Sequence, residues 1–217
     1  MTIDPAAFIR AETLLKPLEF VPELRLHLAD VAVDLWQATE ETLEKTGLPP
    51  PYWAFAWPGG QGLARYLLDH PAIVAGKRVV DLGAGSGLTS LAAAKAGAAS
   101  VLAVDIDVFA LAAIQLNAAA NGVTIATSDA DLMAEPLKDC DLLLIGDLCY
   151  ERPLAERVTT WARAQAARGI PVLLADPGRA YLPETGLQRI TTYTIPTNLD
   201  LEDHESRETA IFRLMAP

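Results

Sequence analysis

The spacing of hydrophobic and polar positions changes along this chain. Near the N-terminus, "ELRLHLA" (23–29) alternates leucines with polar residues, which is typical of a half-buried strand. From residue 77, short apolar runs alternate with longer helical segments. We predict strands at 77–83, 100–107, 123–127, 140–147 and 170–176, and helices at 60–70, 88–98, 108–122 and 153–169. Uninterrupted apolar strands separated by helices indicate a parallel sheet covered on both faces, a doubly wound α/β fold.

The two ends of the chain depart from this alternation. Residues 187–196 and 205–215 form two runs with no helix between them, which predicts an antiparallel hairpin at the sheet edge. At the other end, Asp4 and Pro5 form a helix-start pair, and 33–47 predicts a short helix ended by Gly47. We expect residues 1–50 to be a helical and strand extension packed on the domain formed by residues 51–217.

Composition narrows the class of protein. The 217 residues are 51% hydrophobic and 21% charged, as in one soluble globular domain, and no apolar run approaches the ~20 residues of a membrane span. The N-terminus has no apolar signal core and carries Asp4, Glu12 and Glu19, so we expect a bacterial cytoplasmic protein. We also expect a monomer. The net charge of −11 disfavours a nucleic-acid partner. Two cysteines, Cys140 and Cys149, and three scattered histidines give no metal-binding pattern, so the thiols are expected to fill core volume.

A glycine-rich stretch, "VVDLGAGSG" (79–87), joins the strand at 77–83 to the next helix. Gly83, Gly85 and Gly87 have the spacing G-x-G-x-G, whereas the dinucleotide fingerprint is G-x-G-x-x-G. Glycine lets the backbone approach a ligand closely, and the helix N-terminus offers amide donors. The stretch therefore predicts a cofactor site, with the type of cofactor left to the acids around it.

Two carboxylates near the glycine turn favour S-adenosylmethionine over NAD. Asp105 ends the next strand, where a carboxylate can accept both hydroxyls of a ribose. Asp81 precedes the turn and suits the ammonium of the cofactor's amino-acid end. Ile106 can lie under an adenine ring, and Asp129 either accepts from the exocyclic amine or is a solvated loop acid. Asp107 is expected to cap the following helix.

The run "CDLLLIGD" (140–147) ends on Asp147, and Tyr150 follows three residues later. Ligands of doubly wound sheets lie outside the carboxyl ends of the strands, so Asp147 should point at the transferable methyl group. The structural alternative is a helix cap for 153–169, but Asp147 lies too far before Pro153 to be a regular cap.

Three other segments carry candidate residues. The connector "LPPPYWAFAWPGG" (48–60) is rich in aromatic residues, which either pin a loop to the core or stack on a ligand. In "ADPGRAY" (175–181), Asp176 and Pro177 predict a helix start, and Arg179 is a candidate contact to an acidic substrate surface. "DLEDHE" (200–205) is either a cation or basic-target site or a solvated loop, and we favour the loop.

Several motifs together resemble a known family. "PYWAFAWPGGQGLARYLLDHP", "VVDLGAGSG", "DIDVFALAAIQLNAAANG", "GDLCYE" and "DPGR" are similar to the electron transfer flavoprotein β-subunit lysine methyltransferases, which are class I, seven-strand enzymes with a post-strand D-x-x-Y motif. The resemblance covers roughly residues 20–215. It implies S-adenosylmethionine as cofactor, Asp147 and Tyr150 holding the substrate amine, and Trp57 bordering the cofactor. It also implies methylation of two neighbouring lysines on the flavoprotein β-subunit.

Two alternatives stay open. The segment "TNLDLEDHESRET" (197–209) departs from the family pattern, and some similar sequences are ribosomal protein methyltransferases. A methyltransferase for ribosomal protein or for a small molecule is therefore the first alternative. A nucleotide-binding module without catalysis is the second.

Overall fold

A computed structural model describes residues 4–29, 50–197, 199 and 202–216. The predicted helix at 33–47 lies outside these residues. The described part contains a seven-stranded sheet with the order β5-β4-β3-β6-β7-β9-β8. Its strands are β3 (Arg78–Leu82), β4 (Ser100–Val104), β5 (Ala126–Ser128), β6 (Leu142–Gly146), β7 (Val172–Asp176), β8 (Leu187–Pro196) and β9 (Ser206–Leu214). The first five of these are parallel, and β9 runs antiparallel to both β7 and β8.

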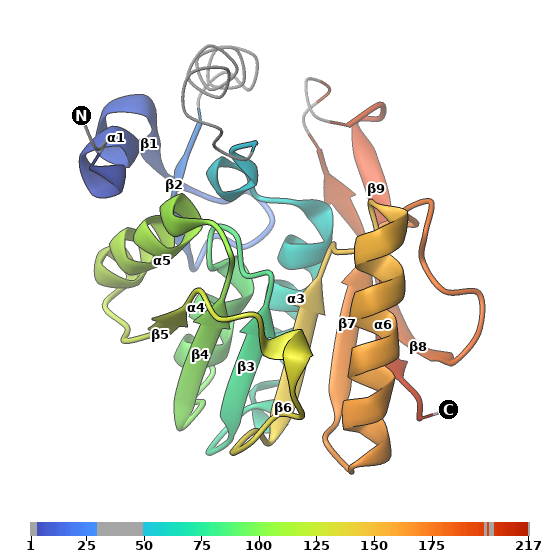
Figure 1. The fold of residues 1–217 in the computed structure, drawn as a ribbon. Coiled ribbons are helices and arrows are strands. Elements are labelled where there is room, and N and C mark those ends of the chain that lie inside the picture. The colour runs from blue at the N-terminus through green and yellow to red at the C-terminus, as the bar shows by residue number, and fades with distance from the viewer. Residues whose placement is uncertain (1–3, 30–49, 198, 200–201, 217) are drawn as a thin grey trace.

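Helices cover both faces of this sheet (Figure 1). They are α3 (Pro58–Asp69), α4 (Leu88–Lys95), α5 (Val108–Asn121) and α6 (Arg152–Ala167). Successive residues of each central strand point to opposite faces, so Leu142 and Leu144 join the core under α3 and α4, while Leu143 and Ile145 join the core under α6. The predicted α/β class, the mostly parallel seven-stranded sheet and the terminal hairpin are all confirmed.

Local signals account for several element boundaries. Asp107 accepts a hydrogen bond from the Phe109 amide at the start of α5, as predicted. Asp4 accepts one from the Ala6 amide and begins α1 (Pro5–Glu12), with proline in the first turn. Among the residues that the structure describes, three 3-10 helices lie in the connections: Tyr52–Ala54, Pro71–Ile73 and Leu132–Ala134.

Three details differ from the sequence prediction. The strand expected at 123–127 begins at Ala126. A strand that was not predicted, β1 (Leu14–Pro17), pairs antiparallel with β2 (Arg25–Leu28). The prediction of a helix after Asp176 is wrong: the Asp176 carboxylate accepts from the amides of Gly178 and Arg179, both at 2.7 Å, and closes a tight turn instead.

Part of the N-terminal extension lies against α5. Two asparagines of that helix hold the strand β2: the His27 amide donates to Asn117 Oδ1 at 2.8 Å, and the Arg25 amide donates to Asn121 Oδ1 at 3.0 Å. Phe8 of α1 contacts the ring of Phe109 edge-on at 5.5 Å. The division of the chain at residue 50 stays a prediction.

Candidate active site

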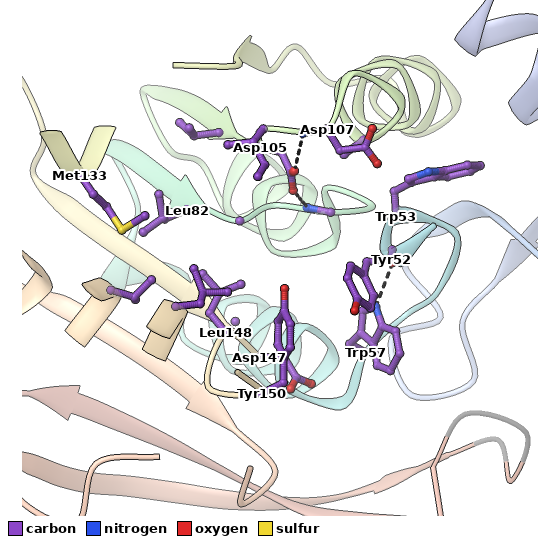
Figure 2. Close-up of a pocket in the computed structure, with 18 of the residues that line it drawn as sticks. Tyr52, Trp53, Trp57, Leu82, Asp105, Asp107, Met133, Asp147, Leu148 and Tyr150 are labelled. Atoms are coloured by element: carbon purple, nitrogen blue, oxygen red, sulfur yellow. Dashed lines mark hydrogen bonds between the residues drawn. The ribbon is translucent and has the colours of Figure 1, made fainter. Parts of the chain in front are cut away.

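A cavity of about 530 Å³ opens where the carboxyl ends of β3, β4 and β6 meet. Figure 2 shows Asp105 and Asp107 on one side, Asp147 and Tyr150 across from them, and Tyr52 and Trp57 on a third side. Seven of the ten predicted site residues line it: Trp57, Gly83, Gly85, Asp105, Ile106, Asp147 and Tyr150. Asp81, Gly87 and Asp129 are not among the lining residues.

The glycine turn forms one wall of the cavity. Gly83 and Gly85 have φ angles of +65° and +51°, a conformation that favours glycine. A Cβ on Gly83 would lie 2.7 Å from the Leu148 side chain, whereas one on Gly85 would meet no atom within 4 Å. Because Gly85 lines the cavity, its missing side chain leaves space for a ligand. Gly87 instead caps α4 and packs against Ile114.

Asp105 is fixed by backbone donors. The Gly85 amide donates to its Oδ2 at 2.8 Å and the Asp107 amide to its Oδ1 at 3.0 Å. Since a carboxylate has about four acceptor positions, Asp105 can still accept from ligand hydroxyls. Burial raises the pKa of Asp105, with these backbone hydrogen bonds opposing the shift. This geometry suits the ribose of S-adenosylmethionine.

The other predicted cofactor residues differ in their exposure and in whether they line the cavity. Ile106 is 81% exposed and lines the cavity as an open apolar surface on which an adenine could lie. Asp129 is exposed on the loop after β5, next to the lining residue Ala130. Asp81 is 2% exposed and accepts a hydrogen bond from Ser90 Oγ at 2.7 Å, and burial raises its pKa to about 7. The roles assigned to these residues stay predictions.

The aromatic connector packs on the core and also lines the cavity, whereas stacking on a ligand stays a prediction. Trp53 and Phe55 are buried in a cluster with Phe109, so they pin the segment to the core. Tyr52 and Trp57 are half-buried and line the cavity. Trp57 Nε1 donates to the Tyr52 carbonyl oxygen at 2.9 Å, which holds the two rings together (Figure 2).

Asp147 directly follows the carboxyl end of β6 and has an uncommon backbone conformation, with φ at +59°. It does not cap α6, whose N-cap is Glu151. Its Oδ2 instead accepts from the amide of Gly59, in the first turn of α3, at 3.0 Å. Arg179 donates Nε to Oδ1 at 2.6 Å and Nη2 to Oδ2 at 3.2 Å. The carboxylate that seems unpartnered in sequence therefore has an arginine and a helix amide as partners.

Tyr150 stands beside Tyr52, with ring centroids 5.4 Å apart. Burial raises the pKa of Tyr150 to about 12, and the neighbouring Tyr52 and nearby acids add to the shift. The side chain is therefore a phenol at neutral pH, a hydrogen-bond donor and an aromatic face. It is not a base.

Sequence reasoning did not find the full set of partners at this site. Arg179 was expected to face a substrate surface, but it faces Asp147 and Glu202. The expectation of a solvated loop at 200–205 is wrong for Glu202, which is 5% exposed and paired with both Arg179 and Arg207. The segments "DPGR" and "DLEDHE" contain the charged residues of this pair, but nothing in the sequence indicates that the two segments meet.

Three further observations concern metal binding, membrane-spanning helices and the cysteines. In the described part of the chain, no group of three or more His, Cys, Asp or Glu side chains could hold a metal ion. The described helices include none with the length and apolar character needed to cross a membrane. Cys140 and Cys149 are buried free thiols.

This chain is similar to two kinds of protein methyltransferase. A family model described as ribosomal protein L11 methyltransferase (PrmA) matches residues 66–144. Electron transfer flavoprotein beta subunit lysine methyltransferases match far more: the zebrafish (Danio rerio) protein is 34% identical over 97% of this chain and 81% of its own length. The mouse (Mus musculus) protein is 36% identical, covering 88% and 76%.

Solved structures agree on the fold. The ribosomal protein L11 methylase of Lactobacillus delbrueckii subsp. bulgaricus has a TM-score of 0.51 and 26% identity over 78% of this chain and 83% of that one. Magnesium protoporphyrin IX methyltransferase from Synechocystis PCC 6803, solved with bound SAH, has a TM-score of 0.51 at 18% identity, covering 71% and 81%.

These comparisons correct one expectation and establish the family. The prediction of a bacterial cytoplasmic protein is wrong by this comparison, because the relatives that match most of the chain are animal proteins. The glycine turn, the fixed Asp105 and the open cavity fit S-adenosylmethionine, the cofactor of this class of enzyme. The chain is an S-adenosylmethionine-dependent methyltransferase that belongs to the electron transfer flavoprotein β-subunit lysine methyltransferase family.

Proposed function

We propose that this enzyme methylates lysine side chains of the electron transfer flavoprotein β-subunit. This is the substrate for which its relatives are named, and those relatives match most of this chain. The observation that carries the proposal is the position of Asp147, on the cavity wall across from Asp105 (Figure 2). A carboxylate there can bind an incoming amine on the side of the cavity that faces the cofactor site.

The extent of each similarity favours this substrate over ribosomal protein. The family model for ribosomal protein L11 methyltransferase matches residues only up to 144, before Asp147 and Tyr150. It therefore covers the strands and glycine turn that hold a cofactor. The flavoprotein methyltransferase relatives also match the acceptor side, including the segment that carries Arg179.

Asp147 can orient the substrate amine because one of its acceptor positions is free. A carboxylate has about four acceptor positions. Three of those on Asp147 are taken, two by Arg179 and one by the Gly59 amide, and the open one is on Oδ1. An amine N–H donated to Oδ1 would fix the direction of the nitrogen lone pair.

Aromatic residues would complete the acceptor site. Tyr52, Trp57 and Tyr150 line the same part of the cavity, and an ammonium or methylated ammonium gains cation–π attraction to such faces. Their rings also exclude water from around the nitrogen. Tyr150, as a phenol, would donate its hydroxyl and take no proton.

The chemistry requires a neutral amine. S-adenosylmethionine supplies, when bound, a methyl group on a sulfonium. Free lysine has a pKa of ~10.4, so the ε-ammonium must first release a proton to water. A neutral nitrogen held by Asp147 would then be placed to accept that methyl group through its lone pair. The residues of this chain contribute mainly by positioning, which can supply a large part of the barrier reduction.

The proposal is tested by incubating the purified enzyme with purified flavoprotein β-subunit and radiolabelled S-adenosylmethionine. We expect label in the β-subunit, on lysine, as mapped by mass spectrometry. Ribosomal protein L11 and a low-molecular-weight lysate fraction serve as parallel acceptors. Label in either of these and none in the β-subunit would overturn the proposed substrate.

A further inference from the structure

Four charged side chains join the acceptor site to the C-terminal hairpin. Arg179 donates to Asp147 on one side and, through Nη2 at 2.6 Å, to Glu202 on the other. Arg207 of β9 donates Nε to Glu202 at 3.0 Å. The network therefore contains two acids and two arginines, and its formal charges cancel.

This network is largely shielded from solvent. The side chains of Asp147 and Glu202 are 6% and 3% exposed, and those of Arg179 and Arg207 are 19% and 26% exposed. Charges interact more strongly in such surroundings than in water. Burial alone would lower the pKa of Arg179, but its hydrogen bonds to Asp147 and Glu202 raise it, so the guanidinium keeps its charge at any working pH.

The turn after β7 explains why Arg179 reaches Asp147. The Asp176 carboxylate holds the amides of Gly178 and Arg179, which turns the chain back over the end of the sheet. The Asp147 amide donates to the Ala175 carbonyl at 2.9 Å, so the ends of β6 and β7 are tied together. The Arg179 guanidinium also lies over the Trp57 ring, 5.8 Å from its centroid.

A lone carboxylate would work against the reaction. It would bind the lysine ammonium well, but an opposite charge within ~4–6 Å favours the charged form of the amine and opposes its deprotonation. A carboxylate paired with arginine is still a hydrogen-bond acceptor, while its negative charge is balanced. The two requirements of the site, holding the amine and letting its proton leave, are then compatible.

We propose that Arg179 is a positioning residue that neutralises Asp147, so that Asp147 orients the substrate lysine without keeping it as an ammonium. Glu202, itself paired with Arg207, holds Arg179 in place for this task. The inference rests on the proposed lysine methylation and extends it to the control of the proton on the substrate.

Other titratable groups also face Asp147 and must be separated from this effect. Burial raises the pKa of Asp176 to about 6 and that of the Cys149 thiol to about 12, and Tyr150 also titrates at about 12. Helix α3 presents the Gly59 amide to Asp147. Of these three groups Asp176 has the pKa nearest to neutrality, and an Asp176→Asn background removes its contribution while keeping an oxygen for the turn.

The test is the pH profile of kcat for methyl transfer to the flavoprotein β-subunit, since kcat reports groups in the enzyme–substrate complex. Arg179→Met leaves the negative charge of Asp147 without its partner. We therefore expect the pH at which kcat reaches half of its maximum, as it rises with pH, to move up by ~1–2 pH units. Glu202→Gln leaves the network with one excess positive charge, and we expect a shift to lower pH. Arg179→Lys should return the midpoint toward wild type. Arg78→Met is the matched control, because Arg78 pairs with Asp139 and Asp141 at the amino ends of β3 and β6, the end of the strands opposite to the site.

Binding of the β-subunit without cofactor, measured by calorimetry at pH 7, gives a second readout. The unbalanced site of Arg179→Met should bind the ammonium form at least as tightly as wild type, although kcat falls. Weaker binding in both Arg179→Met and Glu202→Gln, with unchanged kcat midpoints, would mean that the network only braces the fold and would overturn the inference. A wild-type enzyme that leaves the β-subunit unlabelled at every pH would overturn the proposed function, and the inference with it.

Discussion

Asp147 owes its position to a close approach between two backbones. Its left-handed φ of +59° is uncommon outside glycine, although Asp and Asn tolerate it better than most residues. Gly59 lies against it: a Cβ at position 59 would be 2.7 Å from the Asp147 amide nitrogen and 2.9 Å from the Ala175 carbonyl oxygen. Both contacts are backbone atoms, so neither can move aside cheaply.

Replacing Gly59 should therefore lower the stability of the fold, whereas replacing the neighbouring Gly60 should not. We expect Gly59→Ala to lower the free energy of unfolding by ~1–3 kcal/mol, because overpacking forces backbone shifts. Gly60→Ala is the matched control: its Cβ would meet its nearest atoms at 3.7 and 3.9 Å, and alanine is the better helix former by up to ~1 kcal/mol. Urea unfolding measures both, and equal stabilities for the two variants would contradict this packing argument.

Four neighbouring strands bring the acids of the site together. Asp105 follows β4, Asp147 follows β6 and Asp176 ends β7, with β3 and its glycine turn between the first two. Parallel strands place their carboxyl ends at one edge, so residues far apart in the chain share one cavity. The strand order alone therefore separates the cofactor acid, Asp105, from the acceptor acid, Asp147.

The affinity for S-adenosylmethionine should depend strongly on Asp105 and only weakly on Asp129, although the two acids follow the adjacent strands β4 and β5. Asp105→Asn should weaken S-adenosylmethionine binding by more than ~10-fold, because it removes charge-assisted hydrogen bonds to the ligand. Asp129→Asn should change it less than ~2-fold, since Asp129 is exposed and outside the cavity lining. Isothermal calorimetry measures both affinities, and a larger loss from Asp129→Asn would support its predicted role at the adenine.

The stability of the whole molecule should depend on pH because Asp81 is buried. Its pKa is about 7 in the fold and near 4 when unfolded, so between these values the folded state binds more protons than the unfolded state. Stability from this group is present below pH 4 and is lost as pH rises toward 7.

For the cofactor-free protein, we expect the free energy of unfolding at pH 7 to be ~2 kcal/mol lower than at pH 5 on account of Asp81. The Asp81→Asn variant should lack this decline, since an amide does not ionise. Asp107 and Asp176, whose pKa values burial raises to about 6, contribute in the same direction in both proteins. Parallel curves for wild type and variant would show that Asp81 is ionised in the fold.

Sequence alone predicted the fold well and the site in part. Apolar runs and the glycine turn have local causes, so the sheet, Asp107 as a helix cap and the paired strands 187–196 and 205–215 could be read from the chain. The Arg179–Glu202 pair could not, because its two residues are 23 positions apart and meet only when β9 docks on β7. The Asp176 turn was misread because an Asx turn and a helix cap begin with the same residues.

The central claim, that Asp147 orients the lysine to be methylated, is tested most directly by Asp147→Asn. Asparagine tolerates the left-handed backbone and still offers an oxygen to the Gly59 amide. Asp139→Asn is the matched control, since Asp139 also has a positive φ, of 51°, and pairs with an arginine, but precedes β6. The measurement is the single-turnover rate of methyl transfer to the β-subunit, with the cofactor Kd of each variant. We predict at least a ~100-fold loss of rate for Asp147→Asn at unchanged Kd, and no loss for Asp139→Asn. A rate for Asp147→Asn within a few-fold of wild type would contradict the account.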